Sequence, residues 1–362
     1  MIIPIFLTGL GCCKDEPCVF CNQEISSSKS FVNTDQEIKK RIINTLTEHL
    51  VAPQNLEYPV EVAFYGSTFT SLQFAYQKEL LRFTQENFES LTQKSYKTHL
   101  KVRISTRPDQ IRREELLDLK IRFNLGLVEV GVQSMNDNVL AISKRGHTRK
   151  DVKRAVKDLR EIGIDVSCHQ MIGLPGSTLD DELETAKDIA KLKPKHVRVH
   201  PTLVLRNTVL EEMYRDGDYK PLNLIDAVDI TEKVIRVYRK TGVSVIRIGL
   251  HPSELLMENI VAGPWHPAFR ELVEGKYLLT EASKQLIDHK GQSVSIHIAP
   301  QDETYVRGEN NTNYKWLVDT FELKALEIVK NPDIQRGCLT VVNPTKDMIV
   351  SESQKTQDEA TL

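Results

Sequence analysis

Four of the six cysteines lie within ten residues near the N-terminus of this 362-residue chain. They offer two spacings, Cys13-x4-Cys18-x2-Cys21 and Cys12-x5-Cys18-x2-Cys21. A Cys-x2-Cys pair with a further thiolate close by can supply three ligands to one iron cluster. A structural zinc site closes with four ligands, and no second Cys or His pair follows downstream to complete one. The pattern predicts a metal centre and favours a cluster with one open position, with zinc as the alternative.

Composition places the chain among ordinary globular proteins, at 40% hydrophobic and 27% charged residues. The net charge of -2 gives no overall field that attracts phosphate backbones, although a local basic groove stays open. Residues 1–10 are apolar, but they lack a charged n-region and are too short to span a bilayer. Because the cysteines are clustered and no secretory signal is present, we expect a cytoplasmic protein without membrane contact.

Seven apolar runs recur before residue 250, each separated from the next by a longer stretch with helical spacing. They are residues 2–10, 60–66, 101–106, 126–133, 165–174, 196–204 and 243–250. Runs unbroken by polar alternation are typical of strands buried on both faces. Strand and helix alternate about six times, which requires a parallel sheet with helices outside it. Both an open sheet and a closed or partial barrel satisfy this order.

Ligand-binding residues of such barrels gather at the carboxyl ends of the strands. The residues at those ends here are the cysteine cluster, Gly66-Ser67-Thr68, Ser105-Thr106-Arg107, Glu129 with Gln133, and residues 173–176. His169, His196 and His200 also sit on or beside strands, where a lone histidine is most often a hydrogen-bonded core residue. We therefore expect the functional site at the carboxyl edge of the sheet.

The cysteine run GCCKDEPCVFCNQ (11–23) resembles the cluster loop of radical S-adenosylmethionine enzymes, in particular the branch that contains the catalytic subunit of Elongator. Six more segments extend the resemblance in order: AFYGSTFT (63–70), ISTRPDQI (104–111), VEVGVQSMNDNVL (128–140), KRGHT (144–148), MIGLPGST (171–178) and HPTLVL (200–205). An ordered set is more specific than any single glycine motif. The resemblance implies an α/β fold, a partial (β/α)6 TIM-like barrel with a small C-terminal α+β extension.

Two cofactors are implied by the resemblance, a 4Fe-4S cluster and S-adenosylmethionine. The cluster ligands would be Cys18, Cys21 and either Cys13 or Cys12. The family's commonest loop has three residues between its first two cysteines, whereas this chain has four or five. We favour Cys13 because it gives the shorter loop, and Cys12 stays the alternative.

The resemblance also implies which residues contact S-adenosylmethionine. They are Phe20, Gly66, Ser67, Thr68, Ser105, Arg107, Glu129, Gln133, Arg145, Ile172 and Gly173. Gly66-Ser67-Thr68 matches the segment that binds the methionine amino group, with Ser67 where the family usually has a second glycine. Ser105 and Arg107 match a strand end beside the ribose or the carboxylate. Glu129 and Gln133 are expected on the ribose hydroxyls, Arg145 on the methionine carboxylate, and residues 172–176 on the adenine.

The implied activity is reductive cleavage of S-adenosylmethionine to methionine and a 5′-deoxyadenosyl radical, which abstracts hydrogen from a substrate. An external electron donor of the flavodoxin or ferredoxin type is implied as a partner. The Elongator catalytic subunit modifies wobble uridine in tRNA. This chain has no length for the acetyltransferase domain which that reaction uses, so we expect a different reaction on a tRNA base or a small metabolite. The rival class is a non-catalytic iron-sulfur or zinc scaffold.

Three regions are expected along the chain. Residues 1–250 would form the radical S-adenosylmethionine core, and residues 251–342 an extension that closes the site and contacts the substrate. Residues 343–362 are polar, which predicts a disordered tail.

Overall fold

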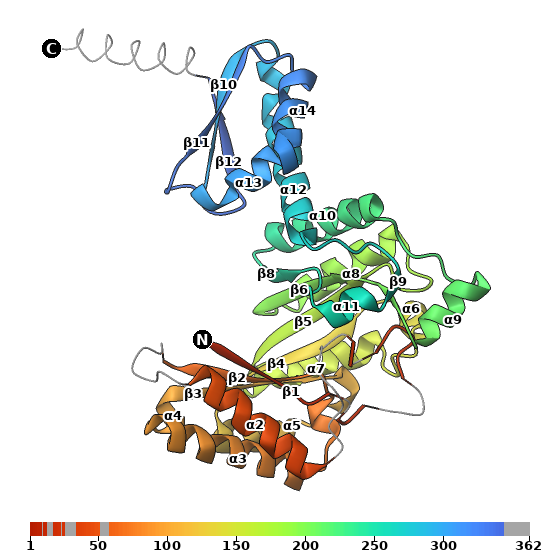
Figure 1. Cartoon of the computed structure of the whole chain (residues 1–362), viewed down its shortest axis with the longest axis vertical. Helices are drawn as coiled ribbons and strands as arrows, with labels where there is room; N and C mark the ends of the chain where they lie inside the picture. The colour runs from red at the N-terminus through yellow and green to blue at the C-terminus, as the bar shows by residue number, and fades with distance from the viewer. Residues whose placement is uncertain (9, 13–16, 23, 26–33, 51–57, 344–362) are drawn as a thin grey trace, which may run out of the picture. The chain divides into compact units, whose positions relative to one another are not determined.

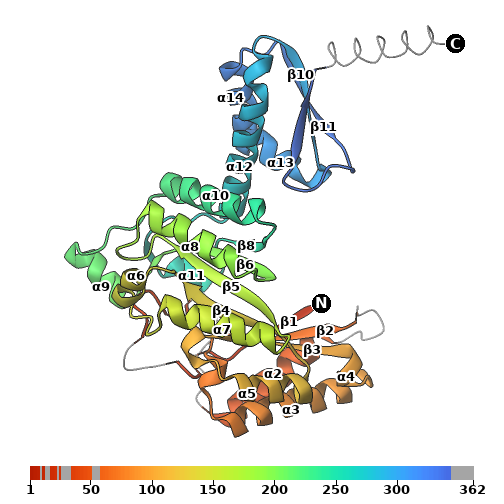
Figure 2. The same ribbon diagram turned by 180° about the vertical axis from the view of Figure 1, so that it is seen from behind.

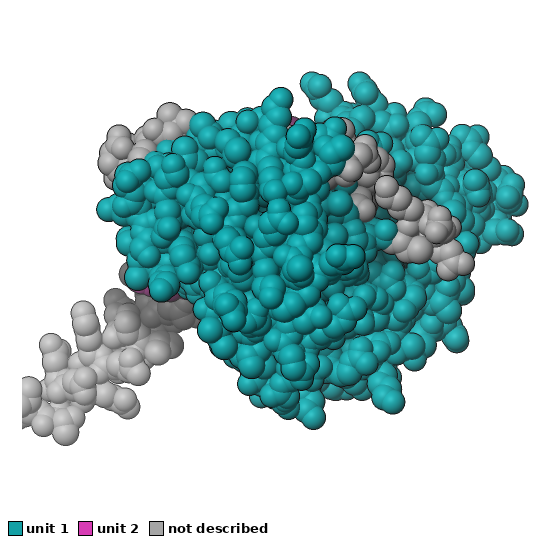
Figure 3. Space-filling view, turned by 90° about the horizontal axis from the view of Figure 1, so that it is seen from below, with its two compact units in different colours: residues 1–267 teal, residues 268–362 magenta. Residues whose placement is uncertain are grey.

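The computed structural model describes residues 1–8, 10–12, 17–22, 24–25, 34–50 and 58–343. Cys13, the favoured first cluster ligand, and residues 344–362 of the expected tail lie outside the described residues. The chain divides into two compact units, residues 1–267 and 268–362, which Figure 3 colours separately. The boundary predicted after residue 250 falls inside the first unit.

The first unit is built on a sheet of seven parallel strands, whose order follows the chain: β1-β2-β3-β4-β5-β6-β8. The strands are β1 (Ile2–Phe6), β2 (Val60–Tyr65), β3 (Leu100–Thr106), β4 (Leu125–Gln133), β5 (Asp165–Ile172), β6 (His196–Pro201) and β8 (Ser244–Ile248). Figure 1 shows that the sheet is curved, with helices along its outer face. The α/β partial barrel is thus confirmed, and its seven strands coincide with the seven apolar runs of the sequence.

Helices supply the crossovers that parallel strands need. The helices described in this unit are α2 (Asp35–His49), α3 (Phe74–Thr92), α4 (Tyr96–His99), α5 (Arg113–Phe123), α6 (Asp137–Ile142), α7 (Arg149–Glu161), α8 (Leu179–Lys191), α9 (Val209–Asp216), α10 (Leu224–Lys240) and α11 (Glu254–Glu258), of which α11 follows the last strand of the seven-stranded sheet. Helices α2, α3, α5 and α7 contact one another in turn, as do α8 and α10. Figure 2 shows α7 and α8 lying over the outer face of the sheet. Short strands β7 (Val204–Leu205) and β9 (Ile260–Ala262) pair separately.

The two faces of the sheet differ in chemistry because successive side chains of a strand point to opposite sides. Val62, Phe64 and Val199 belong to the core beneath the helices and are fully buried. On the concave face, Arg103 of β3 and Arg198 of β6 form ion pairs with carboxylates of other strands. The expectation of strands that are apolar on both faces is therefore wrong for β6, whose residues alternate between apolar and polar.

Three helices of the first unit begin with a capping box, in which a threonine hydroxyl accepts from the N3 backbone N–H while the N3 carboxylate accepts from the threonine N–H. These are Thr34 with Glu37, Thr148 with Asp151, and Thr178 with Asp181. An N-cap of this kind stabilises a helix by about 1 kcal/mol. Thr148 is the last residue of the KRGHT segment, and Thr178 lies two residues after the GLPG segment, so these caps fix where both candidate site loops end.

The second unit contains a three-stranded sheet in the order β11-β10-β12, with β10 and β11 parallel and β10 and β12 antiparallel. Its elements are α12 (Phe269–Leu286), β10 (Ser293–Ile298), α13 (Glu303–Arg307), α14 (Thr312–Thr320), β11 (Ala325–Lys330) and β12 (Leu339–Val342). Leu278, Val306 and Leu317 of its helices pack against Ile296 of the central strand. In the described part of the chain, no helix is long and apolar enough to cross a membrane.

Candidate functional site

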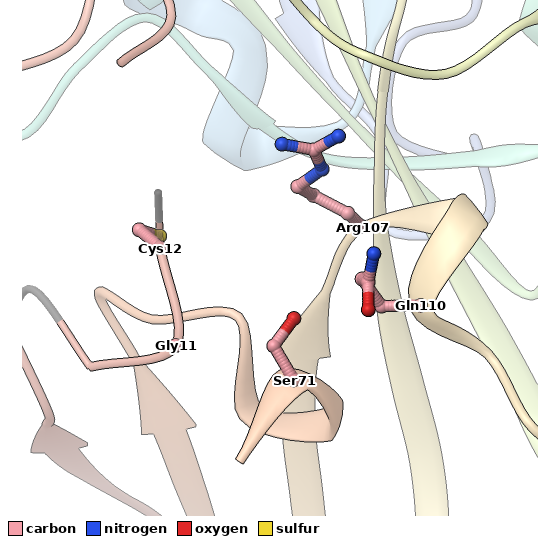
Figure 4. Close-up of a pocket in the computed structure, with 5 residues that line it drawn as sticks. All are labelled: Gly11, Cys12, Ser71, Arg107 and Gln110. Carbon is pink, nitrogen blue, oxygen red and sulfur yellow. The ribbon is translucent and has the colours of Figure 1, made fainter. Parts of the chain in front are cut away.

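A cavity of about 370 Å³ opens at the carboxyl edge of the sheet, lined by Gly11, Cys12, Ser71, Arg107 and Gln110 (Figure 4). These residues follow three different strands, β1, β2 and β3. They meet because parallel strands present their carboxyl ends at one edge. The volume lies within the range of about 300–1,000 Å³ that is typical of small-molecule sites.

The loop after β1 is tied to the loop after β2. Thr68 N donates to Leu10 O at 3.0 Å, and Cys12 Sγ lies 3.2 Å from Thr68 Oγ1. Gly11 is required here, since its φ is +69° and a Cβ would lie 2.2 Å from the Thr68 carbonyl oxygen. The cysteine segment is thereby held against Gly66-Ser67-Thr68, as the predicted site needs.

Cys18 and Cys21 lie on a turn in which Cys21 N donates to Cys18 O at 3.0 Å. Val19 between them is buried, and its backbone accepts from Leu210 N at 2.8 Å and donates to Ser143 O at 3.2 Å. Phe20 packs beside Val19 in a small apolar cluster. The turn is thus anchored to the segments after β4 and β7.

An iron-sulfur cluster of the implied kind needs three cysteine thiolates as ligands. Among the described residues, no three His, Cys, Asp or Glu side chains lie together as a metal site, and Cys13 is not among them. Cys18 and Cys21 are nevertheless thiols on one turn, the ligand type such clusters use. A guanidinium nitrogen of Arg145 also lies 3.0 Å from Cys18 Sγ. The residues present therefore fit the group.

Arg145 is buried and makes two side-chain contacts. Nη1 donates to Cys18 Sγ at 3.0 Å and Nη2 donates to Gly131 O at 2.8 Å. The next residue, Gly146, lies against Arg107, because a Cβ at 146 would be 2.5 Å from Arg107 Nη2. Arg107 lines the cavity together with Cys12. The KRGHT segment therefore contacts Cys18 through Arg145 and the cavity beside Cys12 through Gly146 and Arg107.

Arg107 is held by a bidentate ion pair with Asp109, at 3.0 Å from Nε and 3.1 Å from Nη2. Both residues belong to the turn that follows β3. The preceding strand end carries Ser105, whose Oγ is buried and finds no hydrogen-bond partner in the described part of the chain. The same holds for Ser67 Oγ after β2. Since buried polar atoms are nearly always satisfied, such atoms at one sheet edge suit a polar ligand.

Glu129 and Gln133, expected together on the ribose, lie in different surroundings. The Glu129 carboxylate is ion-paired on the concave face, 3.2 Å from Arg198 Nε and 3.9 Å from Arg103 Nη1. Burial raises the pKa of Glu129, and the two arginines oppose that rise. Gln133 ends β4 with φ +65°, and its Oε1 is buried with no partner among the described residues. Gln133 is the better placed of the two for a ligand at the edge.

The GLPG segment is clamped from both sides at Gly173. Its N–H donates to Glu182 Oε1 at 2.8 Å, and its carbonyl accepts from Tyr219 OH at 2.7 Å. Burial raises the pKa of Glu182 to about 7. Ile172, predicted to pack on adenine, has its side chain in the main core beneath the helices. A ligand at this segment would therefore meet the backbone of Gly173.

A histidine pair on the concave face was not anticipated from the sequence, which favoured isolated core histidines. His169 Nε2 and His200 Nδ1 are 2.9 Å apart on neighbouring strands β5 and β6. Burial, and then Arg198, lower the pKa of His169 to about 3, and the pKa of His200 also falls well below its usual range. Both rings are neutral at pH 7. The alternation in HVRVH (196–200) is the signal that places His200 and Arg198 on one face.

Comparison with known proteins gives a consistent pattern. Residues 7–189 match the Radical SAM superfamily, and residues 194–278 match the Radical SAM C-terminal domain. The chain is 31% identical over 231 residues to an uncharacterized protein of Methanocaldococcus jannaschii, covering 61% of this chain and 66% of that one. It is 25% identical over 281 residues to the tRNA uridine(34) acetyltransferase of the same organism, covering 67% of this chain.

That match covers 52% of the acetyltransferase, so the chain spans about half the length of this relative. Among solved structures, the archaeal Elp3 of Methanocaldococcus infernus superposes with a TM-score of 0.59 at 23% identity. The alignment covers 78% of this chain and 63% of that one. At this level of identity, the likeness establishes a shared fold.

Proposed function

This chain belongs to the radical SAM superfamily, and we propose that it cleaves S-adenosylmethionine reductively at a 4Fe-4S cluster held by Cys18, Cys21 and a third cysteine. Membership confirms the predicted resemblance and the assignment as an enzyme. The observation that carries the proposal is the Cys18–Cys21 turn, which Val19 anchors at the carboxyl edge of the sheet. A cavity of suitable size, lined by Cys12, lies at the same edge.

When bound and reduced, such a cluster would supply one electron to the sulfonium of S-adenosylmethionine, so that a carbon-sulfur bond breaks to give methionine and a 5′-deoxyadenosyl radical for hydrogen abstraction. An external donor of the flavodoxin or ferredoxin type would provide that electron. The third thiolate is Cys13 in our proposal, with Cys12 as the alternative. Cys12 Sγ lies 3.2 Å from Thr68 Oγ1 and borders the cavity, which leaves it beside the site when Cys13 is the ligand.

The chain's own groups would bind and orient S-adenosylmethionine. We assign Ser67 and Ser105 to hydrogen bonds with the ligand, because their buried hydroxyls lack partners within the described ranges. Arg107 borders the cavity and offers a cation for the methionine carboxylate. Gln133 and the backbone of Gly173 are assigned to the ribose and adenine end. Tyr219 and Glu182, which hold Gly173, keep that end in position.

A tRNA base is the substrate class we propose. Its support is the relative named tRNA uridine(34) acetyltransferase, whose match covers 67% of this chain. A small metabolite is the alternative substrate. Incubation of the reduced enzyme with bulk tRNA, followed by nucleoside analysis, should reveal a changed nucleoside and a faster release of 5′-deoxyadenosine. Unchanged tRNA, with no effect on that release, would contradict the tRNA proposal alone.

The cleavage reaction is tested by anaerobic reconstitution with iron and sulfide, reduction with dithionite, and chromatography for 5′-deoxyadenosine. We expect product from the wild type and none from Cys18→Ser or Cys21→Ser. Cys338→Ser is the matched control, because Cys338 is exposed in the second unit, and it should retain the wild-type yield. A fully loaded, reduced cluster that gives no product and does not bind S-adenosylmethionine would favour the scaffold reading.

A further inference from the structure

The contact between Arg145 and Cys18 links a buried cation to a proposed cluster ligand. Nη1 donates to Cys18 Sγ at 3.0 Å, and Nη2 donates to Gly131 O at 2.8 Å. Arg145 is 6% exposed, so the contact is largely shielded from water and weakly screened by salt. The guanidinium is held at two points, and one of them is a cysteine sulfur.

The backbone places Arg145 at this position. Helix α6 ends in a Schellman motif, in which Lys144 N donates to Ala141 O at 3.0 Å and Arg145 N donates to Leu140 O at 2.9 Å. Lys144 takes the left-handed conformation at φ +51° that this motif requires. Arg145 is therefore fixed by a helix cap and does not depend on a long loop for its position.

The same helix cap also fixes the cysteine turn. The C-cap residue Ser143 accepts at its carbonyl from Val19 N, the residue after Cys18, at 3.2 Å. Val19 is 1% exposed. The two ends of the Arg145–Cys18 contact are thus held to one element by backbone hydrogen bonds that do not involve either side chain.

Gly131 provides the space for the guanidinium. A Cβ at this position would lie 3.1 Å from Arg145 Nη2 and 3.3 Å from Gln133 Nε2. The φ angle of Gly131 is not positive, so the backbone conformation here does not require glycine. A side chain at 131 would press on Arg145 while leaving its charge in place.

We propose that Arg145 is a positioning residue that donates a hydrogen bond to the Cys18 thiolate and raises the reduction potential of the cluster. This inference rests on the proposed function. Reduction adds one electron, and hence one negative charge, to the cluster. A fixed cation with an N–H aimed at a ligand sulfur stabilises that more negative state, because hydrogen bonds to sulfur and local charge set cluster potentials. The contact assigns Arg145 to the cluster side of the site, away from its expected place on the methionine carboxylate.

The test is an EPR-monitored redox titration of reconstituted protein without S-adenosylmethionine, together with iron and sulfide content. For Arg145→Met we expect at least a tenfold fall in the equilibrium constant for one-electron reduction, which corresponds to about 59 mV. Arg145→Lys should recover part of the loss. Gly131→Ala should shift the potential in the same direction by less, because it displaces the guanidinium and retains the charge.

Lys144→Gln is the matched control, since it removes an exposed neighbouring charge and leaves the Arg145–Cys18 contact in place. It should leave the potential at the wild-type value. A fully loaded Arg145→Met protein with the wild-type potential would overturn the inference, as would an equal shift in Lys144→Gln. If Arg145→Met does not retain a cluster, an unchanged potential in Gly131→Ala overturns it instead. A wild type that takes up no cluster refutes the proposed function itself.

Discussion

The helix-covered face and the concave face of the seven-stranded sheet are formed by alternate residues of the same strands. Phe64 and Val199 are fully buried in an apolar core on the first face. On the second, Arg103 pairs with Glu61 at 2.7 Å and Arg198 pairs with Glu129 at 3.2 Å. Adjacent residues of one strand therefore differ in role: one packs in the apolar core, and the next belongs to a network of ion pairs.

Buried charges are poor sources of stability, because desolvation offsets most of the attraction between them. We propose that the concave face, which carries these charges, serves binding and catalysis. Neighbouring residues of one strand should then respond differently to substitution. Urea unfolding of the metal-free protein measures each change in the free energy of unfolding given below.

The largest effect is expected on the helix-covered face of β2. Phe64→Ala should lower the free energy of unfolding by about 3–5 kcal/mol, because it removes a fully buried ring and leaves a cavity. Its neighbour Tyr65→Phe removes only a hydroxyl that accepts from Arg198 Nη2 at 2.9 Å, and should cost about 1 kcal/mol. Equal losses of unfolding free energy in the two variants would contradict the difference that we expect between the two faces.

The next largest effect is expected at Glu129. Glu129→Gln removes the carboxylate that faces Arg103 and Arg198, and a buried cation left without its partner should cost about 3 kcal/mol. Arg198→Met in the Glu129→Gln background should recover part of that loss, since it removes the uncompensated charge. A double variant as unstable as the sum of its single changes would show that the pair is not coupled.

Glu182 behind Gly173 should give a pH-dependent effect. Burial raises its folded pKa to about 7 from an ordinary 4.5, so the folded state binds the proton more tightly than the unfolded state. The contribution of Glu182 to the free energy of unfolding is then fully present below pH 4.5. It is lost as the pH rises through 7, by about 2 kcal/mol between pH 5.5 and 7.5. Glu182→Gln should remove this loss, and the exposed Glu184→Gln should retain it.

His169 should give a smaller effect of opposite sign. Its folded pKa is lowered to about 3 by burial and by Arg198, from an ordinary 6.5. The contribution of His169 to the free energy of unfolding is present above pH 6.5. It is lost as the pH falls, by about 1 kcal/mol between pH 6.5 and 5.5. His169→Gln should reduce this acid sensitivity. Cys168→Ala on the opposite face should not, because burial raises the pKa of that thiol to about 12.

Much of the fold was predictable from the sequence. The apolar runs and helical spacings predicted a parallel sheet with helices outside it, since these depend on local periodicity. The cysteine spacing and the residues after β1, β2 and β3 predicted which segments meet at the carboxyl edge. Such predictions succeed because parallel strands bring their ends together whatever the side chains are.

The arrangement of charges was not predictable in the same way. Glu129 and Gln133 were both expected on the ribose hydroxyls, but the register of β4 against β5 shifts between Val130 and Gln133. A second shift lies between Val102 and Arg103. The partners of Arg103 and Glu129 depend on these irregularities, which have no local sequence signal. Arg145 turns inward because Lys144 adopts the left-handed conformation, where a glycine would have been the usual signal.

The central claim is that Cys18, Cys21 and one further thiolate hold a cluster with one iron open to S-adenosylmethionine. Mössbauer spectroscopy of the reconstituted protein, before and after addition of S-adenosylmethionine, tests this claim most directly. We predict that the signal of one iron of the cluster changes when S-adenosylmethionine is added, while the signals of the others stay as they were. An unchanged spectrum, or a protein that binds zinc in place of the cluster, would contradict the claim.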